Sequence, residues 1–421
     1  MIRGGWTMEL IAGVGILAAI LSPAGGPSLA GEAAPPAGGQ SALQAKIAAL
    51  GDNSWVSLGL GHSGGHEVPA VFDQENLLFF KYGGCGDHTQ RINIEGSKRP
   101  DETYGNSCWA VDLKAGQWKM IRPRDMSFPA DRPGNGCSRN YAYDSKRKLV
   151  WMYCGISNGG GGGDNYDLWT YDGAKDTFKK WNAANPSELK GDSAPGCKFV
   201  YDSVHDLLIL PWGKTTRVYD PGKNAWADRQ TPDGPPGPGH YGNMVFEPVR
   251  KRVVYPRVMN TGNRRPADKR PEATPATFWC STRWNEGGKE VKGFQEVAFA
   301  TWAYDVEANK WQKLEIKPEE QPCPRWRFGI TWDSLNKVVV LVAGCAETWD
   351  NDEKYYSDVW AFDPEKDQWT EMKPAGPAPK NSTRECRHCA YDEKDNAVLF
   401  LTASTGLWAY RYKRAPAGAG K

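Results

Sequence analysis

Short hydrophobic stretches, each preceded by an acidic residue and a polar turn, recur along this sequence from about residue 50 onward. The clearest of them read NLLFFKYGG, KLVWMYCG, DLLILPWG and KVVVLVAG. Nearly continuous hydrophobicity over so few residues is typical of β-strands that are buried on both faces of a sheet. No long segment with helical periodicity follows residue 50, so the pattern predicts an all-β protein. The acidic residues that precede the strands are Asp73, Asp144, Asp202, Glu247, Asp333 and Asp392.

A second pattern lies downstream of each hydrophobic stretch. It reads CWAVDLKAGQW, LWTYDGAKDTF, RVYDPGKNAW, TWAYDVEANKW and VWAFDPEKDQW, and a partial sixth copy, LWAYRY, begins at Leu407. An Asp at the end of a strand favours a tight turn, and the aromatic residue of the return strand then packs beside the first strand. In each full copy the aromatic residue stands six positions after the Asp: Asp112/Trp118, Asp172/Phe178, Asp220/Trp226, Asp305/Trp311 and Asp363/Trp369.

Six copies of the two patterns predict six four-stranded sheets. Sheets that are buried on both faces are typical of blades packed around an axis, so we expect a six-bladed β-propeller over residues 52–412. The last blade lacks a fourth strand, because the sequence ends soon after Tyr412. The segment Asn53–Leu60 has the required Trp and alternation. We expect it to supply that strand and close the ring, which removes an exposed sheet edge.

The residues that end these strands carry a resemblance to a known repeat. Glycine closes the second strand of several units, as at Gly83 and Gly213, and Trp-x-Tyr-Asp with a Trp six residues later follows. This arrangement is similar to the Kelch repeat, a group that includes the central domain of galactose oxidase, and the resemblance covers residues 52–412. The resemblance is a strong indication of the fold and a weak indication of the chemistry. The fourth unit (VVYPRV) and the sixth (FLTAST) depart from the pattern because they lack the glycines.

The first 30 residues predict a secretory signal peptide. A basic residue precedes a hydrophobic stretch from Leu10 to Leu21, and small residues follow at Ser28–Ala30. That stretch is too short to be a stable span and no later one approaches the necessary length, so we expect no transmembrane segment in the mature chain. Residues 31–51 predict a linker and a short helix, and residues 413–421 a flexible tail. We expect a secreted or periplasmic monomer.

Composition and charge narrow the class of protein. The formal net charge is +2 and no basic block stands out, which argues against binding to nucleic acid. The ten cysteines form an even set, and disulfides are the expected state in an exported protein. We predict two bonds, Cys137–Cys154 and Cys323–Cys345, because these cysteines flank strand pairs in the second and fifth units. A third, Cys85–Cys108, spans a loop, and each bond would restrict the unfolded chain.

Candidate functional residues lie where the first strand of each unit begins. Along such a strand side chains alternate between two environments, and a mostly polar set stands four and six residues before the acidic positions. We infer that this set faces the central channel: Glu67, Ser138, Asn140, Lys198, Tyr241, Asn243, Arg327, Cys386 and His388. One position further out, His66, Cys137, His240 and Trp326 are expected at the channel mouth. Long connections at 85–107, 156–167, 256–300 and 345–357 reach the same end, which is where function usually lies on a rigid scaffold.

These residues fit two classes of function. A binding module would hold a carbohydrate or protein ligand with Lys198, Asn243, Trp326, Arg384, His388 and His88. A carbohydrate-active enzyme, either a polysaccharide lyase or a galactose-oxidase-like enzyme, would use His66, His240 and Tyr241 for proton transfer and Arg327 to neutralise a carboxylate. A purely structural surface scaffold is a third reading. In this third interpretation the polar residues are solvated at the beginnings of strands or form ion pairs, and the tryptophans pack against other side chains.

The sequence identifies no cofactor. The motif ECRHC (Glu385–Cys389) has two cysteines with one histidine between them, which is a weak zinc pattern. We therefore predict no metal site.

Overall fold

The computed structural model describes fourteen stretches of the chain. They are residues 41–61, 70–85, 104–123, 130–134, 140–153, 167–182, 199–212, 214–235, 243–266, 271–274, 276–346, 354–380, 388–402 and 405–414. Within them the named strands all pair antiparallel, accompanied by helix α1 (Ala42–Ala49) and a short 3-10 helix, η2 (Pro318–Glu320). The all-β prediction is confirmed.

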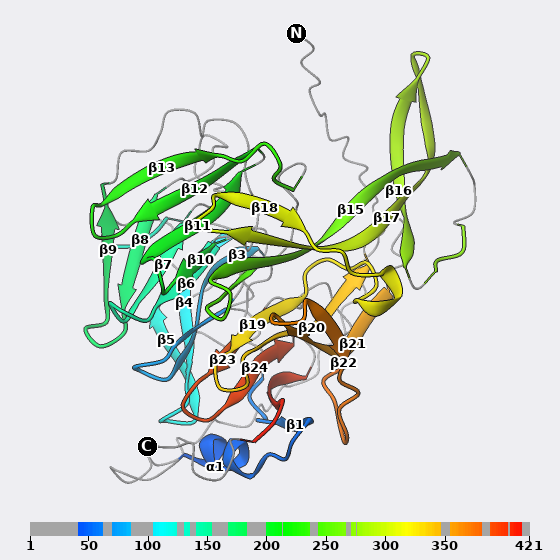
Figure 1. Ribbon diagram of the computed structural model, residues 1–421. Helices are drawn as coiled ribbons and strands as arrows, with labels where there is room; N and C mark the ends of the chain where they lie inside the picture. Colours follow the sequence, from blue (N-terminus) through cyan, green and yellow to red (C-terminus); the bar gives the residue numbers. More distant parts are fainter. Residues whose placement is uncertain are drawn as a thin grey trace, which may run out of the picture. The chain divides into compact units, whose positions relative to one another are not determined.

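The described strands form six sheets, which Figure 1 shows in sequence colours from blue to red. The first sheet holds β2 (Val71–Asp73), β3 (Leu78–Cys85), β4 (Tyr104–Asp112) and β5 (Gln117–Arg122). The second holds β6 (Asn140–Asp144), β7 (Leu149–Tyr153), β8 (Leu168–Asp172) and β9 (Thr177–Trp181). The third holds β10 (Val200–Asp202), β11 (Leu207–Trp212), β12 (Thr215–Asp220) and β13 (Ala225–Gln230).

The remaining three sheets depart from this regular order in two places. The fourth sheet holds β14 (Val245–Glu247), β15 (Arg252–Pro266), β17 (Lys289–Asp305) and β18 (Lys310–Lys313), and β16 (Thr277–Glu286) pairs with the far part of β17. The fifth holds β19 (Gly329–Asp333), β20 (Val338–Ala346), β21 (Lys354–Asp363) and β22 (Gln368–Glu371). The sixth holds β23 (Cys389–Asp392), β24 (Ala397–Thr402) and β25 (Gly406–Arg411), and its fourth strand is β1 (Ser54–Ser57).

The first strands of the sheets contact one another in turn. Strand β2 contacts β6 and β23, β10 contacts β6 and β14, and β19 contacts β14 and β23. Each of these strands lies at the end of its own sheet, so it pairs on one side only. Neighbouring sheets then meet face to face, and clusters of buried aromatic and aliphatic side chains fill the space between them.

One type of turn connects most of the strands. The carboxylate of the acidic residue accepts backbone N–H groups two and three residues later, as Asp144 does from Lys146 (3.0 Å) and Arg147 (2.9 Å). The residue four positions after the acid then adopts a left-handed conformation, which reverses the chain. This holds at eleven turns: Leu77, Gly116, Lys148, Asp176, Asp206, Asn224, Lys251, Asn309, Lys337, Asp367 and Asn396. The acidic residues that mark the sequence repeat are therefore turn formers.

An aromatic pair links the third and fourth strands of most sheets. Tyr219 and Trp226 stand directly opposite each other with ring centroids 5.0 Å apart, and equivalent pairs occur in the second, fourth and fifth sheets. In the sixth sheet the same place is taken by Tyr410 of β25 and Trp55 of β1, also 5.0 Å apart. Strand β1 thus pairs with the last strand, as expected for residues 53–60. It also supplies the aromatic residue that the repeat requires.

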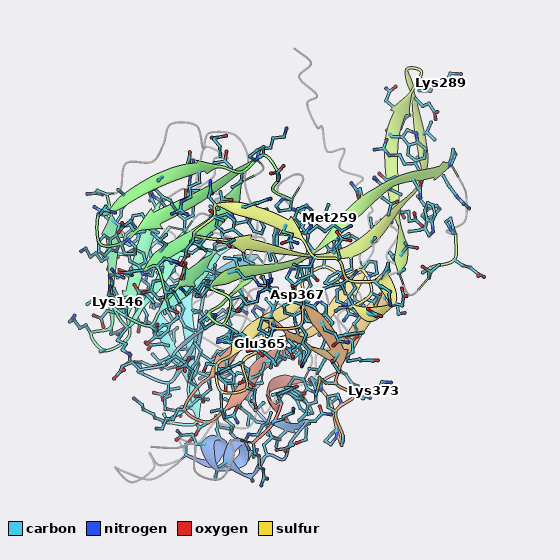
Figure 2. The ribbon with its side chains drawn as sticks, in the orientation of Figure 1. Lys146, Met259, Lys289, Glu365, Asp367 and Lys373 are labelled. Carbon is cyan, nitrogen blue, oxygen red and sulfur yellow. The ribbon has the colours of Figure 1, made fainter. Side chains whose placement is uncertain are left out.

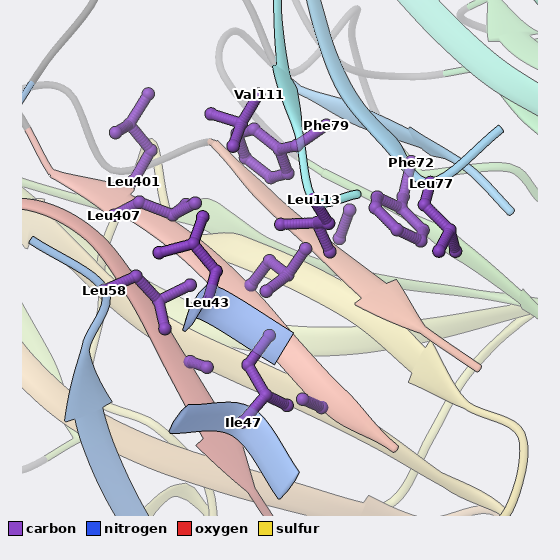
Figure 3. Close-up of a cluster of buried hydrophobic side chains, with 14 of the residues drawn as sticks. Leu43, Ile47, Leu58, Phe72, Leu77, Phe79, Val111, Leu113, Leu401 and Leu407 are labelled. Atoms are coloured by element: carbon purple, nitrogen blue, oxygen red, sulfur yellow. The ribbon is translucent and has the colours of Figure 1, made fainter. Parts of the chain in front are cut away.

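Helix α1 is part of the core rather than a free linker. Ser41 caps it, since the Ser41 hydroxyl accepts the Gln44 N–H (3.3 Å) and the Gln44 side chain accepts the Ser41 N–H (3.2 Å). Leu43 and Ile47 are buried against side chains of both the first and the sixth sheets, including Phe79 and Leu407 (Figure 3). The segment before β1 therefore stabilises the place where the earliest and latest sheets of the chain meet.

The structure corrects two of the predicted disulfides. Cys108 and Cys323 are both free thiols. Cys108 lies opposite Tyr82 in the ladder, whereas Cys85 lies opposite Tyr104, so the two cysteines are several residues out of register. At roughly 3.3 Å per residue this offset exceeds the separation of about 7 Å that a disulfide allows. The Cys137–Cys154 pair lies outside the described residues.

The predicted partner of Cys323 is also misplaced. Cys345 lies opposite Trp326, which is three residues beyond Cys323. The Cys323 sulfur instead accepts a hydrogen bond from Arg325 Nη2 at 3.0 Å. The Cys323–Cys345 bond is therefore not formed.

Replacing Trp55 by alanine is expected to lower the free energy of unfolding by about 3–5 kcal/mol, because it removes the buried aromatic partner of Tyr410. Trp118 provides a matched control. It occupies the same place in the first sheet, but it faces Val111 and is only half-buried. Urea unfolding of both alanine variants checks this, and an equal loss in the two would contradict the role of Trp55.

Candidate functional site

A cavity of about 320 Å³ lies among the first strands of all six sheets. Its lining includes the residue directly before each acidic position, and this residue is aromatic in every sheet: Phe72, Tyr143, Tyr201, Phe246, Trp332 and Tyr391. The residue directly after the acid also lines the cavity and is most often Ser, as at Ser145, Ser203 and Ser334. The cavity thus lies toward the end of the sheets that carries the tight turns. Its wall combines these aromatic and hydroxyl-bearing side chains with aliphatic ones such as Val71, Val200 and Ile330.

Four predicted site residues are described, and none of them lines this cavity. Asn243, Arg327 and His388 are 6%, 4% and 0% exposed. The Asn243 amide donates to the Phe328 carbonyl oxygen, which ties the start of the fourth sheet to the start of the fifth. Trp326 is half-buried and pairs through its backbone with Cys345 (2.8 and 3.0 Å). The other predicted residues lie outside the described stretches: His66, His88, Lys198, His240, Tyr241 and Arg384.

A buried ion pair positions the segment that carries Trp326 and Arg327. Arg325 is 0% exposed and holds Asp358 of β21 with both of its terminal nitrogens, one of them at 2.9 Å. The Arg325 guanidinium also lies over the Tyr356 ring, 4.1 Å from its centroid. Burial alone would raise the pKa of Asp358, but the Arg325 charge and hydrogen bonds from Arg325 and Trp360 outweigh it, so the pKa is lowered.

Two residues next to this ion pair have positive φ angles. Arg327 has a φ of 55°, and Gly344 beside it has a φ of 113°. A Cβ at Gly344 would lie 3.1 Å from the Trp326 carbonyl oxygen and 3.2 Å from the Phe328 side chain, so glycine is needed here. Sequence reasoning missed Arg325 and Asp358. They are 33 residues apart, and no local motif joins them.

The long connection of the fourth sheet is folded into a separate feature, which we call the arm: Met259–Pro266 of β15, all of β16 and Lys289–Ala298 of β17. Figure 2 shows Lys289 at its tip and Met259 at its base. Two arginines of β15 lie over tryptophans of β16, Arg264 at 5.8 Å from the Trp284 ring and Arg265 at 5.2 Å from the Trp279 ring. The tip of the arm is exposed.

A glycine sets the place of Trp284. A Cβ on Gly293 would lie 2.8 Å from the Trp284 ring and 2.3 Å from the Arg265 carbonyl oxygen, so any other residue would displace the ring. The absence of a side chain at Gly293 therefore leaves room for the edge of the Trp284 ring. Trp284 remains partly exposed to solvent.

The base of the arm is attached to the fifth sheet. Phe278 and Val297 of the arm form one cluster with Ala346 and Tyr356, and Trp326 packs against that cluster. The predicted mouth residue Trp326 and the arm thus share one hydrophobic contact. This buried contact joins the arm to β20 and β21 of the fifth sheet.

No helix among the described residues has the length and hydrophobicity of a transmembrane span. Nor does any group of three or more His, Cys, Asp or Glu side chains in those stretches come together as metal ligands would.

One family model and several solved structures are similar to this chain. The Kelch motif family matches residues 334–376, which run from the β19–β20 turn to just beyond β22. The structure of YjhT is similar at 13% identity and a TM-score of 0.48, covering 83% of this chain and 95% of that one. A protein of unknown function from Bacteroides thetaiotaomicron has 9% identity and a TM-score of 0.48, covering 86% and 73%. A copper-bound fungal alcohol oxidase of the AA5 family has 10% identity and a TM-score of 0.46, covering 85% and 75%.

The Kelch motif and the strand order that the other sheets share support a Kelch-type propeller. No curated protein matches the chain.

Replacing Asp358 by alanine leaves the buried Arg325 guanidinium without its charge partner and is expected to lower the free energy of unfolding by about 3–5 kcal/mol. Because the pKa of Asp358 is lowered, the stability it contributes is present at neutral pH and is lost as the pH falls through that lowered value. Urea unfolding at pH 7 and pH 3 should therefore show a larger loss at pH 7. Glu290→Ala, which breaks the exposed 3.2 Å pair with Arg283, is the control and should have almost no effect.

Proposed function

We propose that this protein is an exported, six-bladed Kelch-type propeller that binds a carbohydrate or protein ligand at the end of the sheets that carries the arm. The alternative is a carbohydrate-active enzyme at the same end, with His66, His240, Tyr241 and Arg327 as its working residues. Export rests on the hydrophobic stretch and small residues within the first 30 positions.

Two observations support six blades closed by the N-terminal strand. The first strands contact one another in an unbroken order from β2 through β23 and back to β2. Strand β1 pairs with β25 in register from Ser54 to Ser57, so β23 and β1 are the two outer strands of the sixth sheet. The pairing with β1 covers the edge that β25 would otherwise leave open in the sixth sheet.

The difference between the two ends of the sheets carries the binding proposal. At one end the connections are short turns of a single type, and their lysines pair locally, as Lys175 does with Asp172 (2.7 Å) and Lys366 with Asp363 (2.6 Å). At the other end strand β16 and much of β15 and β17 form the arm. Structure of that size beyond the sheet core is typical of a recognition surface.

The side chains of the arm favour a ligand with flat or hydroxyl-rich groups. Trp284 is held against Gly293 with one face toward Arg264, and aromatic residues with adjacent arginines are enriched in binding sites. Sugar rings and protein aromatic groups both stack on such a platform. Trp326 extends the apolar surface toward the channel mouth through the cluster at the base of the arm.

Replacing Trp284 or His240 by alanine is expected to weaken ligand binding at least tenfold, which corresponds to about 1.4 kcal/mol, with little change in melting temperature. The purified protein is screened against neutral and anionic polysaccharides by affinity electrophoresis, and hits are titrated with each variant. Lys175→Ala and Glu365→Ala, at the tight-turn end, are the controls and should bind normally.

Three outcomes separate the readings. Loss of binding in Trp284→Ala with an intact fold supports the proposed site. A metal in the purified protein, or conversion of a polysaccharide that depends on His240, supports the enzyme instead. Unchanged affinity in both variants would overturn the assignment of this end as the binding surface.

A further inference from the structure

The acidic residue at the end of each first strand has a second polar contact. In the first and fifth sheets an asparagine three residues later donates to the free carboxylate oxygen: Asn76 to Asp73 and Asn336 to Asp333, both at 2.8 Å. In the second sheet Arg147 does so at 2.8 Å.

The third and fourth sheets keep the same rule with other side chains. His205 lies 2.6 Å from Asp202, and Arg252 donates to Glu247 at 2.8 Å. Five buried carboxylates therefore have a donor for their second oxygen, as buried charge requires.

The sixth sheet breaks this rule. The residue three positions after Asp392 is Asp395, which offers a second carboxyl group where the other sheets offer a donor. Asp392 is 0% exposed, and the Oδ2 atoms of both residues are buried with no partner among the described residues. As in the other sheets, the Oδ1 atom of Asp392 accepts hydrogen bonds from the backbone N–H groups of Lys394 (3.1 Å) and Asp395 (3.2 Å). Two facing carboxyl groups bond to each other only if they share a proton.

The protonation state follows from this arrangement. Burial first, and repulsion from Asp395 next, raise the pKa of Asp392 to about 7. The folded protein thus keeps a proton that the unfolded chain releases near pH 4. The stability from this proton is complete below about pH 4, declines as the pH rises toward 7, and is gone above it.

Arg411 connects the carboxyl pair to the N-terminal segment. From β25 it donates to the carbonyl oxygens of Asp395 (2.8 Å) and Asn396 (3.1 Å) on one side and of Ile47 (2.9 Å) and Leu50 on the other. One buried guanidinium therefore ties the acidic turn to the end of α1, directly before β1.

The other groups around the pair do not replace the missing donor. Glu393 and Lys394 are exposed on the turn itself. Gln74, from the β2–β3 turn, bonds to the Tyr391 carbonyl oxygen and the Glu393 N–H. Asp52 and Arg414 act on the charge of Arg411.

We propose that the Asp392–Asp395 pair is a pH-sensitive latch that holds α1 and β1 on the sixth sheet when it carries a proton and loosens them when it loses it. Repulsion between the two carboxylates, whose Oδ2 atoms are both buried, opens the turn, and the Arg411 contacts to α1 are lost with it. The occupant of the latch is the N-terminal segment of this same chain, residues 41–57.

Hydrogen exchange of the full chain, measured by mass spectrometry at pH 5 and pH 8 and corrected for intrinsic exchange, tests the latch. Peptides from residues 41–57 should show at least a tenfold larger opening constant at pH 8 than at pH 5. Peptides from β7 and β20 should change much less. Asp395→Asn restores the donor of the first and fifth sheets and should abolish the difference at residues 41–57.

His205→Asp is the matched control, because it places a second carboxyl group beside Asp202 in the third sheet, whose side chains are not in the cluster that holds α1; Arg147→Asp, beside Asp144 in the second sheet, replaces it if that variant does not fold. The control should make its own sheet sensitive to pH and leave residues 41–57 as in the natural chain. The proposal is overturned if residues 41–57 exchange equally at both pH values, or if Asp395→Asn keeps the full pH effect. A pH effect that Asp395→Asn removes from every sheet alike also overturns it, since that describes global unfolding rather than a latch.

Discussion

A buried carboxylate at the end of each first strand is the constraint on which the other features depend. Removed from water, it must be fully hydrogen-bonded, and the backbone N–H groups of a tight turn supply half of that requirement. The turn fixes the register of the first two strands, and the register aligns aromatic residues on neighbouring strands and sheets. The sixth sheet is the exception, because Asp395 stands in place of the usual donor and the second oxygen of Asp392 has no partner among the described residues.

The two ends of the sheets differ in how the strands are connected. Where tight turns join the strands, short local hydrogen bonds from backbone N–H groups satisfy the turn carboxylates. At the opposite end the fourth sheet departs from the repeat. Its arm is attached to the fifth sheet through the cluster that contains Phe278 and Val297, against which Trp326 packs. Under the proposed function, stability and recognition therefore lie at opposite ends of the strands.

The candidate site could be predicted only in part. Sequence spacing predicted Trp326 at the channel mouth, and in the structure it packs against the base of the arm. The spacing did not find Arg325 and Asp358, because their contact joins distant parts of the chain. It did not predict the aromatic cavity lining, because alternation tells which residues share a face but not which face a given strand turns to its neighbours. The disulfides predicted at Cys108 and Cys323 were wrong, because proximity in the sequence says little about register across a hairpin.

The sequence alone determined the all-β class, the repeated hairpins and the likeness to Kelch repeats, because these depend on local signals: an acid that starts a turn, a left-handed residue after it and an aromatic six positions on. It also pointed to Trp55 as a strand residue, since the repeat lacked one at its end. Only the tertiary structure decided that α1 packs into the core, that Arg411 ties it to the turn of Asp395, and that the long fourth connection folds into an arm. Those features depend on contacts between residues far apart in the chain, whose geometry is set by the packing of whole sheets and not by any local pattern.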